Sequence, residues 1–390
     1  MPLPTPLAWK NLTSNRGKML LSASGIGFAV LLMFMQIGFR NALLDSNVEL
    51  IQLFQADILL ASPARYNLSS ERRFARHWLQ SAAAIEGVQA VAALRSERNT
   101  ARLKVAGSKT RSIRVLAIDP HPEFFQDATL CSALQIADAQ QAVLVDRRSK
   151  SAYGFDLQDL AHLREQVVEL NNRRIPINNW FVLGTDFAND GTLLMSNRLF
   201  PQFFPYRSPS GDPLSLVDIG LVRLAPDCNR AQVLAALRQF NPEEIAVYER
   251  PDFIAREIRF WSRNTPIGII FGIGTIMGLF VGAIICYQIQ FTDISENMPE
   301  LATLKAMGYG SRYFWSLVLC QSFYLACLGF IPGLAVAWGL YQLLATASGM
   351  VMHLTLYRLL LVWVLTLLMC LISGVMALRR LWRADPASLF

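Results

Sequence analysis

The sequence predicts a membrane protein with four transmembrane α-helices and a large α+β extracytoplasmic domain between the first and the second. Charged side chains make up 17% of the 390 residues, whereas an ordinary soluble domain has about 25%. The deficit lies in four runs without Asp, Glu, Lys or Arg. These runs cover residues 19–39, 264–292, 313–357 and 359–378, and they hold 21, 29, 45 and 20 residues. Each run is long enough for a membrane-spanning helix, which needs about 20 residues.

The distribution of basic residues predicts the topology. Residues 42–262 carry 25 basic and 25 acidic side chains, whereas the rest of the chain carries 11 basic and 4 acidic ones. The excess lies at the N-terminus, in the loop around 293–312 and at the C-terminus, and the positive-inside rule places such short flanks in the cytoplasm. We therefore expect a multi-pass protein of the cell inner membrane with both termini cytoplasmic. The neutral domain has no bulk charge for nucleic acid, so no nucleic-acid partner is expected.

The N-terminal part is predicted to be a membrane anchor. Residues 1–18 are expected to form a cytoplasmic interfacial helix, with Trp9 at the headgroup level. The first span is expected over 19–41. Its apolar stretch is longer than that of a signal peptide and no A-x-A-like cleavage site follows, so we expect the span to be retained.

The domain over residues 42–250, expected in the periplasm, shows mixed periodicity. Asn171-Asn172 lies between two strand-like runs and indicates a hairpin. Amphipathic helices are expected over 71–81 and 229–240. The strand patterns cover 56–60, 112–118, 142–145, 166–170 and 218–224.

Two further features of the outer region leave alternatives open. Residues 251–263 repeat apolar positions at helical spacing, which favours a stalk helix that leads into the second span over a separate surface helix. Cys131 and Cys228 lie in the outer domain, and their spacing does not decide whether they pair.

The C-terminal part is predicted to contain three spans. The 45-residue run could hold two helices around Pro332-Gly333, but five spans would place the C-terminal arginines outside. We therefore expect one long third span, kinked at Pro332 and Gly333 because proline removes a backbone hydrogen bond. The expected segments are the second span (264–291), a cytoplasmic coupling loop (292–311), the third span (312–346), a short outer loop (347–357), the fourth span (358–378) and a cytoplasmic tail (379–390).

Glycines recur along the second span. Small residues four positions apart let helix backbones approach closely, so the pattern predicts a helix-packing face. Its partner is either another span of this chain or a second copy, and the alternative is that glycine is simply common in membrane helices. The glycines are Gly268, Gly272, Gly274, Gly278 and Gly282.

The inner loop predicts a self-contained helix over residues 299–307. Pro299 suits the first helical position and Glu300 the first turn, where the helix dipole favours negative charge. Lys305 suits the last turn and Gly308 a left-handed C-terminal cap. The apolar side chains of this helix need a surface, which is either the lipid interface or a cytoplasmic partner; they are Leu301, Leu304 and Met307.

Motifs of catalysis and of metal binding are missing from the sequence. There is no Gly-x-x-x-x-Gly-Lys-Ser/Thr, Gly-x-Ser-x-Gly, His-Glu-x-x-His or Cys-x-x-Cys pattern. No charged residue lies in the middle of a span, which argues against a proton relay or an ion-coupled path. We therefore expect no enzyme activity and no cofactor on this chain. Energy for any transport would come from another chain.

The segment Glu300-Leu-Ala-Thr-Leu-Lys-Ala-Met-Gly308 resembles the inner-loop motif of FtsX/MacB-type ABC transporter permeases. The order of one span, a large outer domain and three spans is also similar to theirs. A closer resemblance, to the DevC-type exporter permeases of cyanobacteria, runs over nearly the whole chain and is weakest over 60–165. It is carried by Phe34-Met-Gln-Ile-Gly-Phe-Arg40, Asp45-Ser-Asn47, Asn172-Arg-Arg-Ile175, Thr265-Pro-Ile-Gly268, Tyr287-Gln-Ile289, Thr292-Asp293, Ala302-Thr-Leu-Lys-Ala-Met-Gly-Tyr309, Gly329-Phe-Ile-Pro-Gly333 and Ala384-Asp-Pro-Ala387.

The resemblance implies a permease subunit without its own ATPase. A separate P-loop ABC ATPase subunit, which holds ATP and Mg, would bind the inner loop of each copy in a permease homodimer. A periplasmic membrane-fusion adaptor would engage the outer domain, and a TolC-like outer-membrane protein would complete the duct. In the DevC-type system the cargo is heterocyst envelope glycolipid. The expected ATPase-coupling residues are Asp293, Glu296, Glu300, Leu301, Leu304, Lys305, Met307 and Gly308.

Other functions use the same elements. An FtsX-like regulator would switch on a periplasmic cell-wall hydrolase. A lipoprotein-releasing permease would need a lipid-modified cargo and no duct. A membrane-anchored receptor or assembly factor would need no ATPase.

Overall fold

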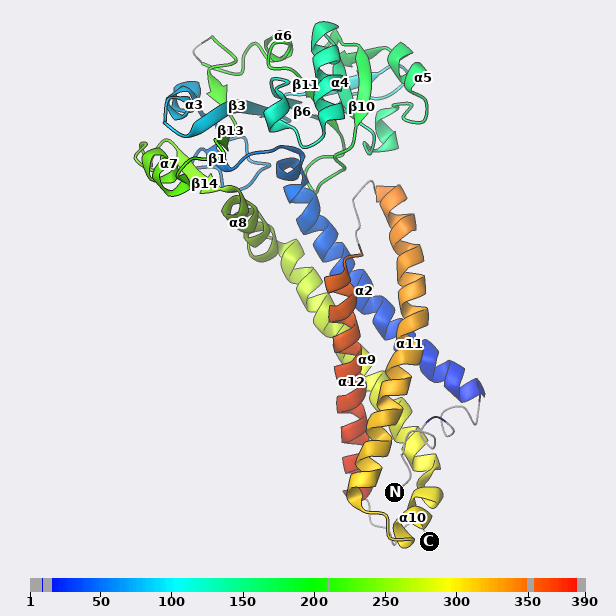
Figure 1. Cartoon of the computed structure of the whole chain (residues 1–390). Helices are drawn as coiled ribbons and strands as arrows, with labels where there is room; N and C mark the ends of the chain where they lie inside the picture. Colours follow the sequence, from blue (N-terminus) through cyan, green and yellow to red (C-terminus); the bar gives the residue numbers. More distant parts are fainter. Residues whose placement is uncertain (1–8, 10–15, 210, 349–353, 384–390) are drawn as a thin grey trace. The chain divides into compact units, whose positions relative to one another are not determined.

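The structure, a computed structural model, describes residues 9, 16–209, 211–348 and 354–383. The chain divides into two compact units. The membrane unit comprises Met1–Asn41, Pro266–Leu344 and Met352–Phe390, and the outer unit comprises Ala42–Thr265 with a short segment from Ala345. Among the described residues, four helices are long and apolar enough to cross a membrane (Figure 1). The predicted fold class, four spans with a mixed α/β domain between the first and second, is confirmed.

The four long helices extend beyond the predicted spans. They are α2 (Arg16–Leu53), α9 (Pro266–Glu296), α11 (Ser311–Ser348) and α12 (Leu356–Arg383). Helix α2 continues past residue 41 into the outer unit, and α9 includes residues that the sequence places in the inner loop. Apart from Trp9, the predicted interfacial helix before Arg16 lies outside the described residues, as do residues 349–353 of the outer loop and the tail from 384.

The membrane unit is held together where helix backbones touch. A Cβ atom at Gly333 of α11 would lie 2.7 Å from the carbonyl oxygen of Gly27 of α2, so these two helices cross in close contact there. Pro332 lies inside a continuous α11. Because a Cβ atom at position 333 would meet the Gly27 carbonyl, the crossing with α2 requires glycine there. The sequence pattern does not predict this contact. The core around it comprises Ile26, Ala29, Val30, Met33, Phe34, Ile37, Cys286, Leu325, Ala326, Phe330, Ala337, Val362, Met369 and Cys370.

The outer unit is built on an eight-stranded mixed sheet with the order β10-β7-β11-β6-β3-β13-β1-β14. The pairs β10–β7 and β11–β6 are parallel, and the others are antiparallel. The strands are β1 (Ile58–Ala61), β3 (Val88–Glu97), β6 (Arg114–Ala117), β7 (Val143–Asp146), β10 (Ile177–Phe181), β11 (Thr192–Met195), β13 (Ile219–Leu224) and β14 (Ala246–Glu249).

Two smaller sheets complete the strands. One has the order β5-β4-β8-β9 and the other pairs β12 with β2. Asn171 and Asn172 connect β8 to β9 with φ angles of 51° and 62°, the left-handed pair of a tight hairpin turn, as predicted. The strands are β2 (Phe74–Ala75), β4 (Arg102–Val105), β5 (Arg111–Ser112), β8 (Val168–Leu170), β9 (Arg173–Arg174) and β12 (Leu216–Val217).

The helices of the outer unit cover the sheets and bury their apolar faces. The expected helix over 71–81 starts only at Arg76, because Phe74 and Ala75 pair with β12. Cys131 belongs to the core under α4 and Cys228 borders a different core near α7, and both thiols are free. The helices are α3 (Arg76–Ala83), α4 (Ala128–Ala139), α5 (Leu160–Glu165), α6 (Phe200–Phe203), α7 (Arg230–Leu237) and α8 (Arg250–Arg263).

Candidate functional site

The inner loop folds into the short helix α10 (Met298–Ala306), shifted by one residue from the expected range. Its C-terminal end is capped by its own chain. The Gly308 N–H donates to the Lys305 carbonyl at 3.0 Å, and the Tyr309 N–H donates to the Leu304 carbonyl at 3.2 Å. Gly308 has φ +91°, so these bonds form a Schellman cap, which favours glycine at this position. The helix therefore ends sharply without help from neighbouring elements.

One face of α10 is open. Glu300, Leu304 and Met307 lie at spacings of four and three residues, so they share this face. Glu300 is exposed, Leu304 is half-buried and Met307 is 63% exposed. Lys305 is also exposed. Met298, in contrast, packs against the apolar cluster near the C-terminal ends of α9 and α12 and the N-terminal end of α11. The side chain of Leu301 lies outside the described residues.

A layer of polar side chains near the C-terminal end of α9, the end that leads into α10, links α9 to α11 and α12 by hydrogen bonds. Asp293 accepts a hydrogen bond from the Gln321 amide of α11. The Gln290 amide donates to the Cys370 carbonyl of α12 at 2.8 Å and accepts from the Ser322 hydroxyl at 2.7 Å. Asp293 therefore contributes to packing between helices, whereas Glu296 is exposed. Sequence reasoning missed this layer, although Gln321 and Ser322 interrupt an otherwise apolar run.

The glycines of α9 do not share one environment. A Cβ atom at Gly282 would lie 2.8 Å from the Ala29 Cβ atom of α2, and one at Gly274 would lie 2.5 Å from the Gln36 amide oxygen. At Gly278 the nearest atom is 3.8 Å away, and at Gly272 no atom lies within 4 Å. Gly282 therefore sits at a helix contact inside the unit. The surface around Gly272 is open and is flanked by exposed isoleucines.

The stalk helix α8 is anchored in the outer unit by a buried carboxylate. Glu257 is 2% exposed, and its carboxylate oxygens accept from the Leu68 N–H at 3.0 and 3.1 Å. The same carboxylate accepts from the Trp261 indole N–H at 2.8 Å. Burial raises the pKa of Glu257 despite these hydrogen bonds. Phe253, one turn earlier, is 3% exposed and packs in the core of the sheet.

The loop held by Glu257 leads to a buried ionic network, which we call the arginine cluster. Arg65 donates to the Asp218 carbonyl at 2.6 Å and lies 3.7 Å from its carboxylate. The Asp218 carboxylate also accepts from the Arg207 guanidinium, and Arg73 pairs with Glu97 at 2.7 Å. Burial lowers the pKa of Arg65 and of Arg207 and raises that of Glu97. The cluster links the stalk to strands β3 and β13.

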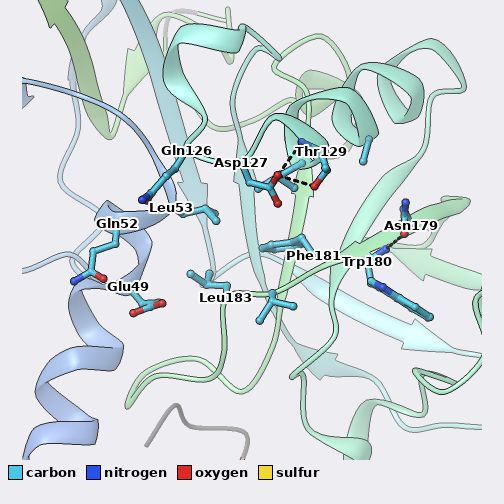
Figure 2. A pocket seen from close by; sticks show the side chains of 13 residues that line it. Glu49, Gln52, Leu53, Gln126, Asp127, Thr129, Asn179, Trp180, Phe181 and Leu183 are labelled. Carbon is cyan, nitrogen blue, oxygen red and sulfur yellow. Dashed lines mark hydrogen bonds between the residues drawn. The ribbon is translucent and has the colours of Figure 1, made fainter. Parts of the chain in front are cut away.

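A cavity of about 550 Å³ lies in the outer unit between the end of α2, the start of α4 and the end of β10 (Figure 2). Asp127 accepts from the Thr129 N–H at 2.8 Å and from its hydroxyl at 2.7 Å, and these bonds lower the pKa of Asp127. The described lining holds no Lys, Arg or His, so it suits neutral or cationic groups better than anions. It comprises Glu49, Gln52, Leu53, Gln126, Asp127, Thr129, Leu130, Ala133, Asn179, Trp180, Phe181, Val182 and Leu183. Within the described residues, no three His, Cys, Asp or Glu side chains group to hold a metal ion.

Residues 272–386 match the family model described as FtsX-like permease C-terminal. The matched part of the chain contains most of α9, all of α10 and both later spans. Two solved structures are similar to the chain. One is the periplasmic region of MacB from Actinobacillus actinomycetemcomitans, at 13% identity and TM-score 0.34 over 52% of this chain and 92% of that chain. The other is the extracellular domain of the noncanonic ABC-type transporter YknZ from Gram-positive bacteria, at 10% identity and TM-score 0.31 over 50% of this chain and 100% of that chain.

Proposed function

We propose that this chain is the non-catalytic permease subunit of an inner-membrane ABC exporter of the FtsX/MacB type, with both termini in the cytoplasm. The observation that carries the proposal is the match of residues 272–386 to the FtsX-like permease C-terminal family. That match includes α10, whose C-terminal end is capped by its own chain and which has an open face. A helix of this kind suits a docking element for a cytoplasmic partner.

The partner at α10 is a separate P-loop ATPase that holds ATP and Mg. Leu304 and Met307 supply apolar contacts, with Leu301 beside them in the sequence. Glu300, Lys305 and Glu296 supply charge around these contacts, and Gly308 ends the helix so that it moves as one piece. Asp293 has a positioning role, because its bond to Gln321 keeps the adjoining end of α9 in place.

Motion passes from α10 through α9 to the stalk α8 and then to the sheet of the outer unit. Glu257 and the loop around Arg65 connect the stalk to Asp218, so a displaced stalk pulls on strands β3 and β13. The outer unit then acts on a periplasmic membrane-fusion adaptor and, through it, on a TolC-like outer-membrane protein. The working form is a homodimer, and the cargo is a glycolipid or another amphiphile, as in DevC-type exporters.

A pull-down in mild detergent tests the proposal. The tagged full chain should recover a P-loop ATPase, and the double variant Glu300→Lys, Leu304→Asp should not. Losing a docked apolar anchor costs about 1–3 kcal/mol, or about 5- to 150-fold in affinity. Ala306→Asp is the matched control, because exposed Ala306 lies on the opposite side of α10 from Leu304.

Each outcome of the pull-down discriminates between functions. An adaptor in the same eluate favours export, and a cell-wall hydrolase in its place favours the regulator. Recovery of the ATPase with the double variant would refute α10 as the docking element. No ATPase with the intact wild-type chain would refute the permease function and favour the receptor.

A further inference from the structure

Four aromatic side chains from three distant segments meet on the stalk helix. The ring centroids of Tyr66 and Phe260 are 5.6 Å apart, those of Phe260 and Trp261 5.7 Å, and those of Phe187 and Trp261 5.6 Å. Tyr66 is 57% exposed and Phe187 is 55% exposed, whereas Phe260 and Trp261 are half-buried beneath them. We call these four side chains the aromatic patch. It presents a contiguous apolar surface to the outside of the outer unit.

Phe187 is held outward by a braced turn. Asp186 accepts from the Ala188 N–H at 2.8 Å and from the Asn189 amide at 2.9 Å. The Asp186 carboxylate also pairs with Arg114, and both side chains are less than 10% exposed. The exposure of Phe187 is therefore a property of a fixed turn rather than of a loose loop.

Tyr66 and Trp261 are fixed by the stalk anchor. The Arg256 guanidinium donates to the Arg65 carbonyl, next to Tyr66. The Glu257 carboxylate accepts the indole N–H of Trp261, so the polar edge of this ring is satisfied inside the outer unit. What the patch offers to a ligand is apolar ring surface. A contiguous aromatic surface that is held rigidly exposed is typical of a site that binds another protein or a membrane.

The covalent chain keeps the patch close to the membrane. Pro266, the first residue of α9, follows Trp261 by five residues, which span at most about 18 Å even when fully extended. This limit holds for any arrangement of the two units. Arg259 and Arg263 are exposed on the same helix. Aromatic side chains with adjacent basic ones are typical of the bilayer interface, where rings lie at the headgroup level and cations meet phosphates.

We propose that the aromatic patch is a lipid-binding site that rests on the headgroup region of the bilayer surface facing the outer unit. Tyr66 and Phe187 enter the boundary between headgroups and acyl chains, and Arg259 and Arg263 lie beside lipid phosphates. The site gives the outer unit a second attachment to the membrane besides its two covalent connections. It does not depend on an ATPase, an adaptor or export.

Quenching by spin-labelled lipid tests this site in the full chain. An environment-sensitive fluorescent amino acid replaces Phe187, and the protein is reconstituted in nanodiscs that contain a lipid with a spin label on its headgroup. The matched control carries the same fluorophore at Tyr206, which is 96% exposed in the same unit. We expect several-fold stronger quenching at 187 than at 206. A fluorophore at position 66 should behave as at 187, which guards against an effect of one substitution on folding.

The alternatives give different results. Equal quenching at 187 and 206 in folded protein would overturn the site. Nanodiscs that hold a single copy separate lipid from protein contact: quenching at 187 should persist there. Fluorescence at 187 that is shielded from the lipid label, and only in discs with two copies, would assign the patch to a contact between copies and overturn the lipid site.

Discussion

The stalk helix α8 and the short helix α10 flank the same span, α9, one at each of its ends, and they differ in how deeply their side chains are buried. Helix α8 has 14 residues and places Phe253 and Glu257 inside the outer unit at 3% and 2% exposure. Helix α10 has 9 residues, and none of its described side chains is buried. The apolar face of α8 is therefore packed against the rest of the chain. The face of α10 that carries Leu304 and Met307 remains available to a partner.

The difference indicates how the two ends of α9 are used. A helix whose face is already buried transmits displacement to the structure it is packed in, because protein cores deform little. A helix whose C-terminal end is capped by its own chain, and whose described side chains are not buried, can be displaced by a partner without disrupting a core. In the proposed exporter, the ATPase therefore displaces α10, and α8 transmits the displacement to the sheet of the outer unit.

The largest expected effect compares one apolar truncation at each helix. Phe253→Ala should destabilise the outer unit by about 3–5 kcal/mol, because it empties a buried aromatic position. Met307→Ala should change the stability of the membrane unit, to which α10 belongs, by less than about 0.5 kcal/mol, because the side chain is exposed. The measurement is the urea dependence of proteolysis in the detergent-solubilised full chain, followed separately for fragments of the outer unit and of the membrane unit. Equal losses at the two positions would contradict the assignment of α8 as anchored and α10 as free.

A smaller loss of stability is expected from a substitution in α9, the span that connects α8 to α10. Gly282→Leu should destabilise the membrane unit by about 1–3 kcal/mol, because the contact with Ala29 of α2 leaves no room for a side chain. Gly272→Leu is the matched control on the same helix, at a position with no atom within 4 Å. Thermal aggregation of the full chain in detergent measures both. A larger loss of stability for Gly272→Leu than for Gly282→Leu would indicate that α9 packs through Gly272 against a second copy of the chain.

The sequence predicts well what depends on local pattern. The charge-free runs locate the four spans, and Pro299, Glu300 and Gly308 locate α10, because a membrane span and a capped helix are determined by nearby residues. The pattern does not predict β3, since Val88–Glu97 is rich in alanine, which favours helix. This segment is a strand because β13 and β6 pair with its two edges.

The arginine cluster could not be predicted from the sequence either, because it too depends on contacts between residues far apart in the chain. Arg65 and Asp218 are 153 residues apart, and charged residues are expected at the surface unless a partner is known. Only the completed sheet brings Arg65, Arg207 and Asp218 together. The same holds for Glu257. Its spacing places it on the same helix face as Phe253 and Trp261, but the pattern does not predict that its carboxylate accepts a hydrogen bond from the Leu68 N–H.

The smallest expected effect is the pH dependence of the stalk anchor. Burial raises the pKa of Glu257 above its ordinary value of 4.5, so the folded outer unit binds this proton more tightly than the unfolded chain does. The stability that protonation of Glu257 adds is complete below pH 4.5 and is lost as the pH rises through the raised pKa. The variant Glu257→Gln cannot titrate. Wild type should therefore gain stability relative to the variant as the pH falls towards 4.5, with a slope of at most about 1.4 kcal/mol per pH unit.

The matched control for this titration is Glu244→Gln. Exposed Glu244 accepts a hydrogen bond from the Trp78 indole at 2.9 Å, the same type of bond that Glu257 accepts from Trp261. The difference in unfolding free energy between wild type and each variant is measured from pH 5 to pH 8 by urea-dependent proteolysis. A pH slope for Glu257→Gln no larger than that for Glu244→Gln would contradict a buried, proton-binding anchor. The stalk would then be held by Phe253 and its apolar neighbours alone, and α8 would differ from α10 only in how much apolar surface it buries.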